Sequence, residues 1–252
     1  MTIVFLHGVP ESPFIWDAVR GLLPEESVAL RLPGFGSARP PEIKDKDRYA
    51  DWLAGELRTI GGPIDLVGHD WGGHLALRMV TAYDSVPVRS WVCDVAYGWH
   101  PDYQWHPAAA LWQKSPEGEQ SLAGIRAGTP GTFGELLRPL GMTAECGADI
   151  DAAHGATMSD SILALYRSAW PNLHSDWGAS VTAPIAKPGL LLTALNGLDG
   201  VDQDETLAQN ADMARAFDAR LVPLEGLSHY WMLQAPERAV ETLRNFWAEA
   251  AS

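Results

Sequence analysis

The sequence has few cysteines, few basic residues and no long hydrophobic run. Its 252 residues include only Cys93 and Cys146, and neither lies in a spacing typical of a zinc site or a disulfide framework. Lysine and arginine number 18 against 32 aspartates and glutamates, which gives a formal charge of −14. A chain this acidic repels nucleic-acid phosphates and anionic membrane surfaces. We therefore expect no metal or other cofactor, no nucleic-acid partner and no membrane contact.

The start of the chain and its apolar runs bear on location. The first residues lack the basic start of a signal peptide. Every apolar run is far shorter than the roughly 20 residues of a membrane-spanning helix. A cytoplasmic location is therefore expected.

Six short apolar runs have lengths typical of strands buried on both faces of a parallel sheet. They cover residues 3–6, 28–32, 64–67, 88–95, 190–195 and 220–224. Between them, apolar positions recur at helical spacing, as in residues 49–60, 75–83 and 236–247. This alternation predicts a doubly wound α/β protein with about six mostly parallel strands.

The alternation is interrupted between residues 96 and 187. That stretch has helical patterns, no clear strand and five tryptophans. We predict a core formed by residues 1–95 and 188–252, with a helical cap at 96–187 on the carboxyl edge of the sheet, where α/β folds bind ligands. Trp99, Trp105 and Trp112 are candidates for the wall of a substrate pocket.

The segment IDLVGHDWGG at residues 64–73 has the strand–turn–helix pattern of a nucleophile elbow, with Asp70 where a serine is usual. Flanking glycines allow the sharp turn that exposes the central side chain. A serine that attacked a saturated carbon would leave a stable ether, whereas a carboxylate leaves an ester that water can cleave. An aspartate at this point therefore indicates displacement at saturated carbon through a covalent ester.

The motifs around this elbow resemble those of the α/β-hydrolase superfamily, and within it the epoxide hydrolases and the related haloalkane dehalogenases. GHDWGG at residues 68–73 is similar to the epoxide hydrolase elbow, and HGVPES at residues 7–12 resembles the oxyanion segment. The resemblance implies an α/β-hydrolase fold whose first strands are missing and which carries a helical cap insertion. It also implies an oxyanion hole formed by the N–H groups of Val9 and Trp71.

The resemblance further implies a late histidine base and an acid that orients it. His229 follows a predicted strand and precedes the last helix, as the family pattern requires. A base that takes a proton from water must be neutral, so activity should fall at acid pH. Asp199 is the first candidate for the acid, and Asp202 and Asp94 are the alternatives.

An epoxide that opens benefits from a proton donor, and two cap tyrosines resemble the ring-opening pair of epoxide hydrolases. These are Tyr166 and Tyr103. We therefore predict hydrolysis of a small apolar or aromatic epoxide to a diol, by a chain compatible with a homodimer. Two alternatives stay open. One is carbon–halogen hydrolysis, which predicts two indole N–H groups at Asp70, and the other is a catalytically silent domain that binds a hydrophobic ligand.

Overall fold

Six parallel strands form one sheet in the order β2-β1-β3-β4-β5-β6. The computed structural model describes residues 1–196 and 202–250 of the chain. Strand β3 is buried along its whole length and is mostly apolar, as a strand covered on both faces should be. Its one charged residue, Asp65, is paired with Arg89 and Ser90. The predicted six-stranded parallel sheet is confirmed. The strands are β1 (Thr2–Leu6), β2 (Ser27–Leu30), β3 (Ile64–Gly68), β4 (Val88–Cys93), β5 (Gly189–Asn196) and β6 (Arg220–Ser228).

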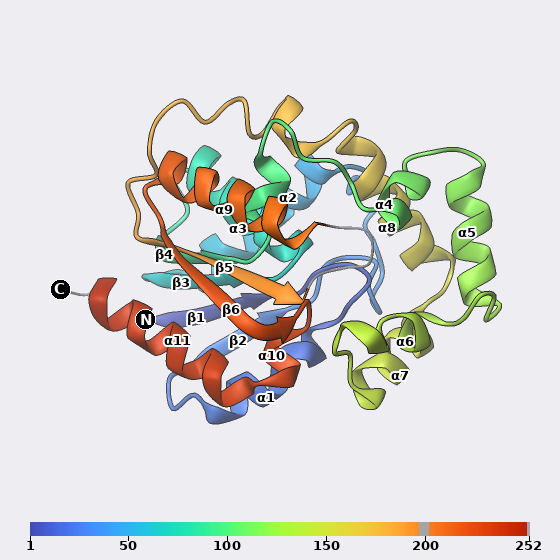
Figure 1. Ribbon diagram of the computed structural model, residues 1–252, viewed down its shortest axis with the longest axis horizontal. Helices are drawn as coiled ribbons and strands as arrows, with labels where there is room; N and C mark the ends of the chain where they lie inside the picture. Colours follow the sequence, from blue (N-terminus) through green and yellow to red (C-terminus); the bar gives the residue numbers. More distant parts are fainter. Residues whose placement is uncertain (197–201, 251–252) are drawn as a thin grey trace.

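Helices cover both faces of the sheet (Figure 1). On one face lie α1 (Asp17–Leu22) and α11 (Pro236–Ala250), which pack against each other. On the other face lie α2 (Lys46–Ile60), α3 (Trp71–Ala82) and α9 (Gln203–Phe217). The short helices of the core are η1 (Pro13–Trp16), η2 (Ala96–Trp99) and α10 (Trp231–Gln234). No helix in the described ranges combines the length and the apolar character that a membrane crossing needs.

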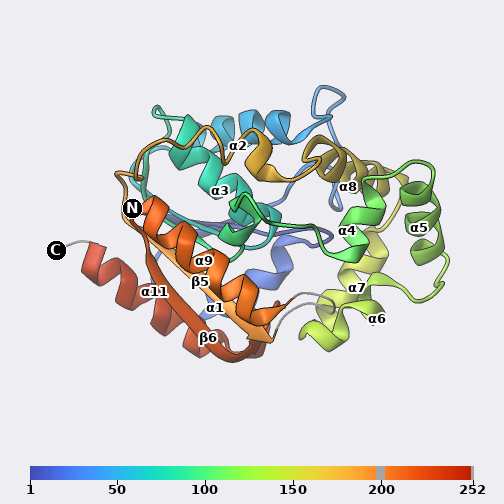
Figure 2. The same ribbon diagram turned by 45° about the horizontal axis from the view of Figure 1, so that its top comes forward.

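The chain between β4 and β5 forms a helical insertion whose helices α4 to α8 lie beyond the carboxyl ends of the strands (Figures 1 and 2). Helices α4, α5 and α8 pack together, and α6 packs on α7. The insertion therefore covers the edge of the sheet at which the strands end. Its helices after η2 are α4 (Pro107–Trp112), α5 (Glu117–Arg126), α6 (Phe133–Leu136), η3 (Arg138–Leu140), α7 (Ala144–Ala153), α8 (Ala156–Ser168) and η4 (Leu173–Ser175).

A buried lysine ties the end of this insertion to the core. Lys46, the first residue of α2, is 2% exposed, and its ammonium lies 2.5 Å from Asp176 and 3.0 Å from Asp47. The same ammonium lies 4.9 Å from the centre of the Trp177 ring, whose Nε1 donates to Asp47 at 2.8 Å. A buried charge is tolerated only when it is paired, so this cluster holds the segment after η4 against α2.

Candidate active site

Asp70 lies at a sharp turn between β3 and α3. Its backbone has φ 49° and ψ −123°, a conformation that residues other than glycine rarely adopt. The turn brings the end of β3 so close to α3 that a Cβ on Gly68 would lie 2.3 Å from the Gly72 carbonyl oxygen. Only glycine fits at position 68, and the segment has the geometry of the predicted elbow.

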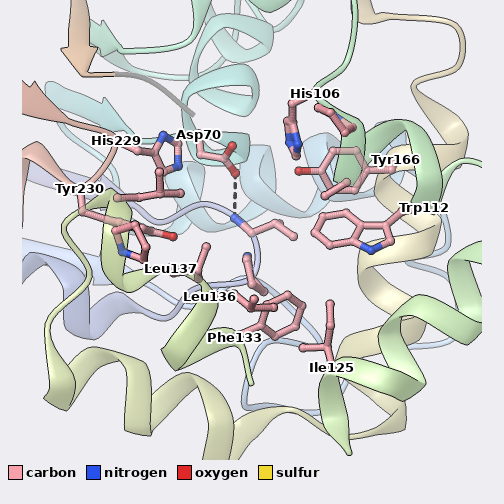
Figure 3. A pocket seen from close by; sticks show the side chains of 16 residues that line it. Asp70, His106, Trp112, Ile125, Phe133, Leu136, Leu137, Tyr166, His229 and Tyr230 are labelled. Atoms are coloured by element: carbon pink, nitrogen blue, oxygen red, sulfur yellow. Dashed lines mark hydrogen bonds between the residues drawn. The ribbon is translucent and has the colours of Figure 1, made fainter. Parts of the chain in front are cut away.

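The Asp70 carboxylate accepts hydrogen bonds from two backbone N–H groups. The Val9 nitrogen lies 2.8 Å from Asp70 Oδ1 (Figure 3), and the Val9–Pro10 peptide bond is cis. Burial and the negative charge of Glu11 raise the pKa of Asp70 to about 7, although His69 and the N–H groups of Val9 and Trp71 lower it. The N–H groups predicted for the oxyanion hole therefore face the side chain on which an ester would form.

A cluster of buried charged side chains packs against the elbow. His69 Nδ1 lies 2.5 Å from Asp94 Oδ2, and His69 Nε2 lies 3.1 Å from Glu11 Oε1. The Asp94 carboxylate also accepts from Trp231 Nε1 at 2.7 Å and from the Asp70 backbone nitrogen at 3.0 Å. Burial by itself would lower the pKa of His69, but the charges of Asp94 and Glu11 outweigh burial and raise the pKa well above its usual value.

Sequence reasoning did not predict this cluster. The available signals were the glutamate of HGVPES and the histidine that precedes Asp70. Both positions looked like parts of motifs rather than partners of each other, because only the fold brings β1 and β3 side by side.

His229 follows β6 and faces the same cavity as Asp70 (Figure 3). Its ring centre lies 4.5 Å from that of His69. Burial and the positive charge of His69 lower the pKa of His229 to about 3, and the charge of Asp94 opposes them. The imidazole is therefore neutral at pH 7 and able to accept a proton, as a base must be.

The candidates for the orienting acid have different surroundings. Asp199 lies outside the described residues. Asp202 is exposed and caps α9, because its Oδ1 accepts from the backbone nitrogens of Asp204 and Glu205 at 2.9 and 3.1 Å. Asp94 is 6% exposed and lies in the buried cluster beside His69. Of the two described candidates, the structure brings Asp94 to the site and leaves Asp202 at a helix end.

The cavity at Asp70 has a volume of about 340 Å³ and mainly apolar walls. Most of the wall comes from the insertion, above all from α4, α6 and η3, and several of its side chains are labelled in Figure 3. The polar groups in it are few and lie near the elbow. The apolar side chains that the insertion contributes are Pro107, Ala108, Trp112, Ile125, Phe133, Leu136, Leu137, Pro139 and Leu140.

The predicted tryptophan wall needs correction at two positions. Trp112 lines the cavity, as expected. Trp99 is fully buried on η2 and packs against Trp177, at a ring-centre distance of 5.8 Å, so it belongs to the core. Trp105 stacks on Trp71 at 6.1 Å and lies outside the cavity wall.

Tyr166 lies on the opposite side of the cavity from His229, and Figure 3 shows its hydroxyl directed toward Asp70. Burial raises the pKa of Tyr166 well above its usual value, so the hydroxyl keeps its proton and is a donor. Tyr103 does not line this cavity. Its ring packs against Trp105 at 5.2 Å and faces two other hollows of the surface. The predicted pair of tyrosines is therefore reduced to one.

His106 is a polar residue of the cavity that sequence reasoning missed. Its ring centre lies 6.3 Å from that of Tyr166. Its Nδ1 accepts from the backbone nitrogen of Ala109 at 3.4 Å as the N-cap of α4, so the proton of the neutral ring is on Nε2. Burial lowers the pKa of His106 to about 4, which keeps the ring neutral. The sequence signal was a histidine directly before Pro107, a helix-start position.

One group among the described residues has the donors of a metal site. Glu11 Oε1, His69 Nε2 and His229 Nε2 lie within 4.8 Å of one another, and two histidines with a carboxylate are a set that zinc uses. A metal ligand must be a deprotonated histidine. The raised pKa of His69 means that a metal would have to displace the proton on Nε2, which faces Glu11.

Comparison with solved structures identifies the same architecture. The CorEH epoxide hydrolase superposes with a TM-score of 0.77 at 18% identity, over 98% of this chain and 91% of that one. The Cif epoxide hydrolase of Acinetobacter nosocomialis has a TM-score of 0.72 at 17% identity, over 98% and 82% of the two chains. A haloalkane dehalogenase DbeA variant of Bradyrhizobium elkanii has a TM-score of 0.70 at 20% identity, over 100% and 91%. These similarities concern the fold.

Curated relatives match only part of the chain. The "Putative 2-succinyl-6-hydroxy-2,4-cyclohexadiene-1-carboxylate synthase" of Haemophilus influenzae is 35% identical over 80 residues, which are 31% of this chain and 32% of that protein. The "Probable oxidoreductase EphD" of Mycobacterium tuberculosis is 34% identical over 79 residues, 28% of this chain and 13% of that protein. The matches thus span a third or less of these relatives. In contrast, the model of the "Alpha/beta hydrolase family" matches residues 3–242, and the chain therefore belongs to the alpha/beta hydrolase family.

Proposed function

We propose that this protein hydrolyses small apolar or aromatic epoxides to diols through a covalent ester on Asp70. One observation carries the proposal: across one apolar cavity the nucleophile faces two neutral donors, Tyr166 and His106, and a neutral base, His229. The insertion then acts as a cap that supplies the donors and the walls. Its apolar side chains match a substrate with little polarity of its own.

In the first step, an oxygen of the ionised Asp70 carboxylate attacks a ring carbon of the epoxide. The carbon–oxygen bond of the ring breaks, and the oxygen takes a proton from the Tyr166 hydroxyl, helped by a hydrogen bond from His106 Nε2–H. The product is a hydroxyalkyl ester of Asp70. His229 takes no part in this step, because no proton has to be removed from the reactants.

In the second step, water attacks the carbonyl carbon of the ester and gives a proton to His229. The Val9 and Trp71 N–H groups stabilise the negative charge that develops on the Asp70 oxygen. The intermediate then expels the diol oxygen, which takes the proton from His229. The proton left on the Asp70 carboxyl returns through solvent to Tyr166, and one oxygen of the carboxylate now comes from water.

For the acid that assists His229, the geometry favours Asp94 over Asp202. Asp94 is buried beside His69 and its charge acts on His229, whereas Asp202 caps an exposed helix end. Replacement of each candidate by asparagine separates them. Asp94→Asn should slow decay of the ester far more than Asp202→Asn, and Asp199→Asn tests the candidate that sequence reasoning put first.

Carbon–halogen hydrolysis remains the second candidate, because Trp71 Nε1 and Trp112 Nε1 are buried without a hydrogen-bond partner among the described residues. An indole N–H is a suitable donor to a departing halide. The orientation of Trp112 weighs against it, since Figure 3 shows its ring nitrogen on the side away from Asp70. Tyr166, in contrast, presents its oxygen to the nucleophile.

The test is a product assay with a panel of aryl and alkyl epoxides and 1-haloalkanes. We expect diol from an epoxide, no diol with Asp70→Ala, and undiminished activity with Asp202→Asn as the matched carboxylate control. Halide release without diol would establish the second candidate instead. A single turnover in H₂¹⁸O adds a mechanistic readout: the label should enter Asp70 and be absent from the first diol, whereas direct attack by water would label the diol at once.

A further inference from the structure

The loop that carries His229 is tied to the insertion on both sides of the histidine. The Ser228 hydroxyl donates to the carbonyl oxygen of Leu140, and the Tyr230 backbone nitrogen donates to the same oxygen at 3.2 Å. Residues 228 and 230 thus share one acceptor in the insertion. The position of His229 between them depends on where that carbonyl lies.

A side chain of α10 completes this connection. Gln234 Oε1 accepts from the Ser228 backbone nitrogen at 2.7 Å and lies 3.0 Å from the Ser228 hydroxyl. Gln234 also packs on the backbone of Gly141, where a Cβ would meet its Cδ at 2.7 Å, and Gly141 has φ 98°. The positive φ favours glycine at this position, and an added Cβ would displace the end of the Gln234 side chain. We name the four residues Leu140, Gly141, Ser228 and Gln234 the latch.

The same stretch of the insertion is part of the cavity wall. Leu137, Pro139 and Leu140 line the cavity together with Asp70 and His229. A substrate that presses on this wall therefore contacts the segment whose carbonyl holds the base loop. A misplacement of about 1 Å at a reacting group reduces rates by up to about 100-fold. A small movement of this wall would therefore shift His229 enough to change the rate of the step that uses it.

We propose that the latch positions His229 for hydrolysis of the ester, so that the insertion controls the second step of the reaction as well as the choice of substrate. This rests on the proposed function, in which only the second step uses His229. Ser228 and Gln234 are positioning residues because they act on the base through the loop. Their loss should slow decay of the ester and leave its formation unchanged.

The experiment follows the ester on the intact protein. The enzyme is mixed with styrene oxide, and samples are quenched in acid at a series of times. Mass spectrometry of the intact protein then gives the fraction that carries the hydroxyalkyl adduct. For Ser228→Ala and Gln234→Ala we expect ester decay about ten-fold slower than in the unmodified enzyme, with the rate of formation within about two-fold. Gln234→Glu keeps an oxygen acceptor for the Ser228 nitrogen and should restore normal decay.

A matched control removes a serine tie at another point between insertion and core. The Ser168 hydroxyl oxygen accepts from the Lys46 backbone nitrogen at 2.9 Å, far along the chain from His229. Ser168→Ala should change neither rate. A merely structural weakening would slow both steps or lower the melting temperature alike in Ser228→Ala and Ser168→Ala.

The outcomes distinguish a failure of the latch proposal from a failure of the proposed function. Normal decay in both latch variants, while His229→Ala traps the ester, would overturn the latch and leave the proposed function intact. If no ester forms on the unmodified enzyme or on His229→Ala, the proposed function fails and the latch with it. Should Ser228→Ala fail to fold, the pair Gln234→Ala and Gln234→Glu decides the question.

Discussion

Replacement of Asp70 should make the protein more stable, and by an amount that depends on pH. Burial and the charge of Glu11 raise the pKa of Asp70 from 3.8 to about 7. The folded protein therefore holds a proton on Asp70 at pH values where the unfolded chain has lost it. Stability falls as the pH rises from about 4 to about 7, and above pH 7 the full cost of ionising this carboxyl is present.

The size of the effect follows from the same values. A pKa of about 7 in place of 3.8 corresponds to roughly 4 kcal/mol above pH 7. Asp70 borders a cavity that admits water, which screens the repulsion from Glu11, so we expect about half of this, roughly 2 kcal/mol. Asp70→Asn removes the charge, keeps the shape and still offers an oxygen to the Val9 N–H.

Chemical unfolding at several pH values tests this reasoning. Asp70→Asn should gain about 2 kcal/mol at pH 8, or about 4 to 8 °C in melting temperature for a chain of this size, and little at pH 4. Asp202→Asn, a change of the same chemistry at an exposed helix end, should give no such pH dependence. An equal gain at pH 4 and pH 8, or no gain at pH 8, would refute the claim that the buried charge is the cause.

Three further predictions follow from the site and the fold. Because the proposed nucleophile, Asp70, must be ionised, kcat/KM for an epoxide should rise with pH and level off above about 7. The profile should follow the pKa of Asp70 rather than that of His229, and a profile already flat at pH 5 would contradict this. Tyr166→Phe should slow ester formation about 100-fold, whereas Tyr103→Phe should leave it unchanged, as measured by the same timed mass spectrometry. Asp176→Ala removes one partner of the buried Lys46 and should cost about 2 kcal/mol in urea unfolding, with Asp160→Ala as an exposed control.

The core of the protein was predictable because its signals are local. Buried parallel strands produce continuous apolar runs, and the elbow needs glycines at fixed positions around Asp70. The pattern of residues 64–73 therefore predicted both a turn and a chemistry. The strand ends moved by a few residues between prediction and structure, as β6 shows, which continues to Ser228 rather than ending at residue 224.

The insertion was harder to predict because its short helices set side-chain directions through packing. Tyr103 and His106 are three residues apart, yet one packs on Trp105 outside the cavity and the other lines it. Trp99 and Trp112 likewise have different surroundings: Trp99 packs against Trp177 and Trp112 lines the cavity. The acid was undecided for another reason: a carboxylate that caps a helix and one that pairs with a buried histidine look alike in sequence. The contacts of Asp202 and Asp94 distinguish the two.

The latch uses a main-chain oxygen of the insertion. Side chains of the cavity wall can therefore change in evolution independently of the contact that holds the His229 loop. Every residue has a backbone carbonyl, so a substitution at position 140 that keeps the backbone conformation also keeps the acceptor for Ser228 and Tyr230. The side chains of α6 and η3, which shape the far end of the cavity, can therefore be exchanged without loss of that contact. Replacement of a few wall residues would then change the shape of the cavity, while the groups proposed to form and cleave the ester keep their positions.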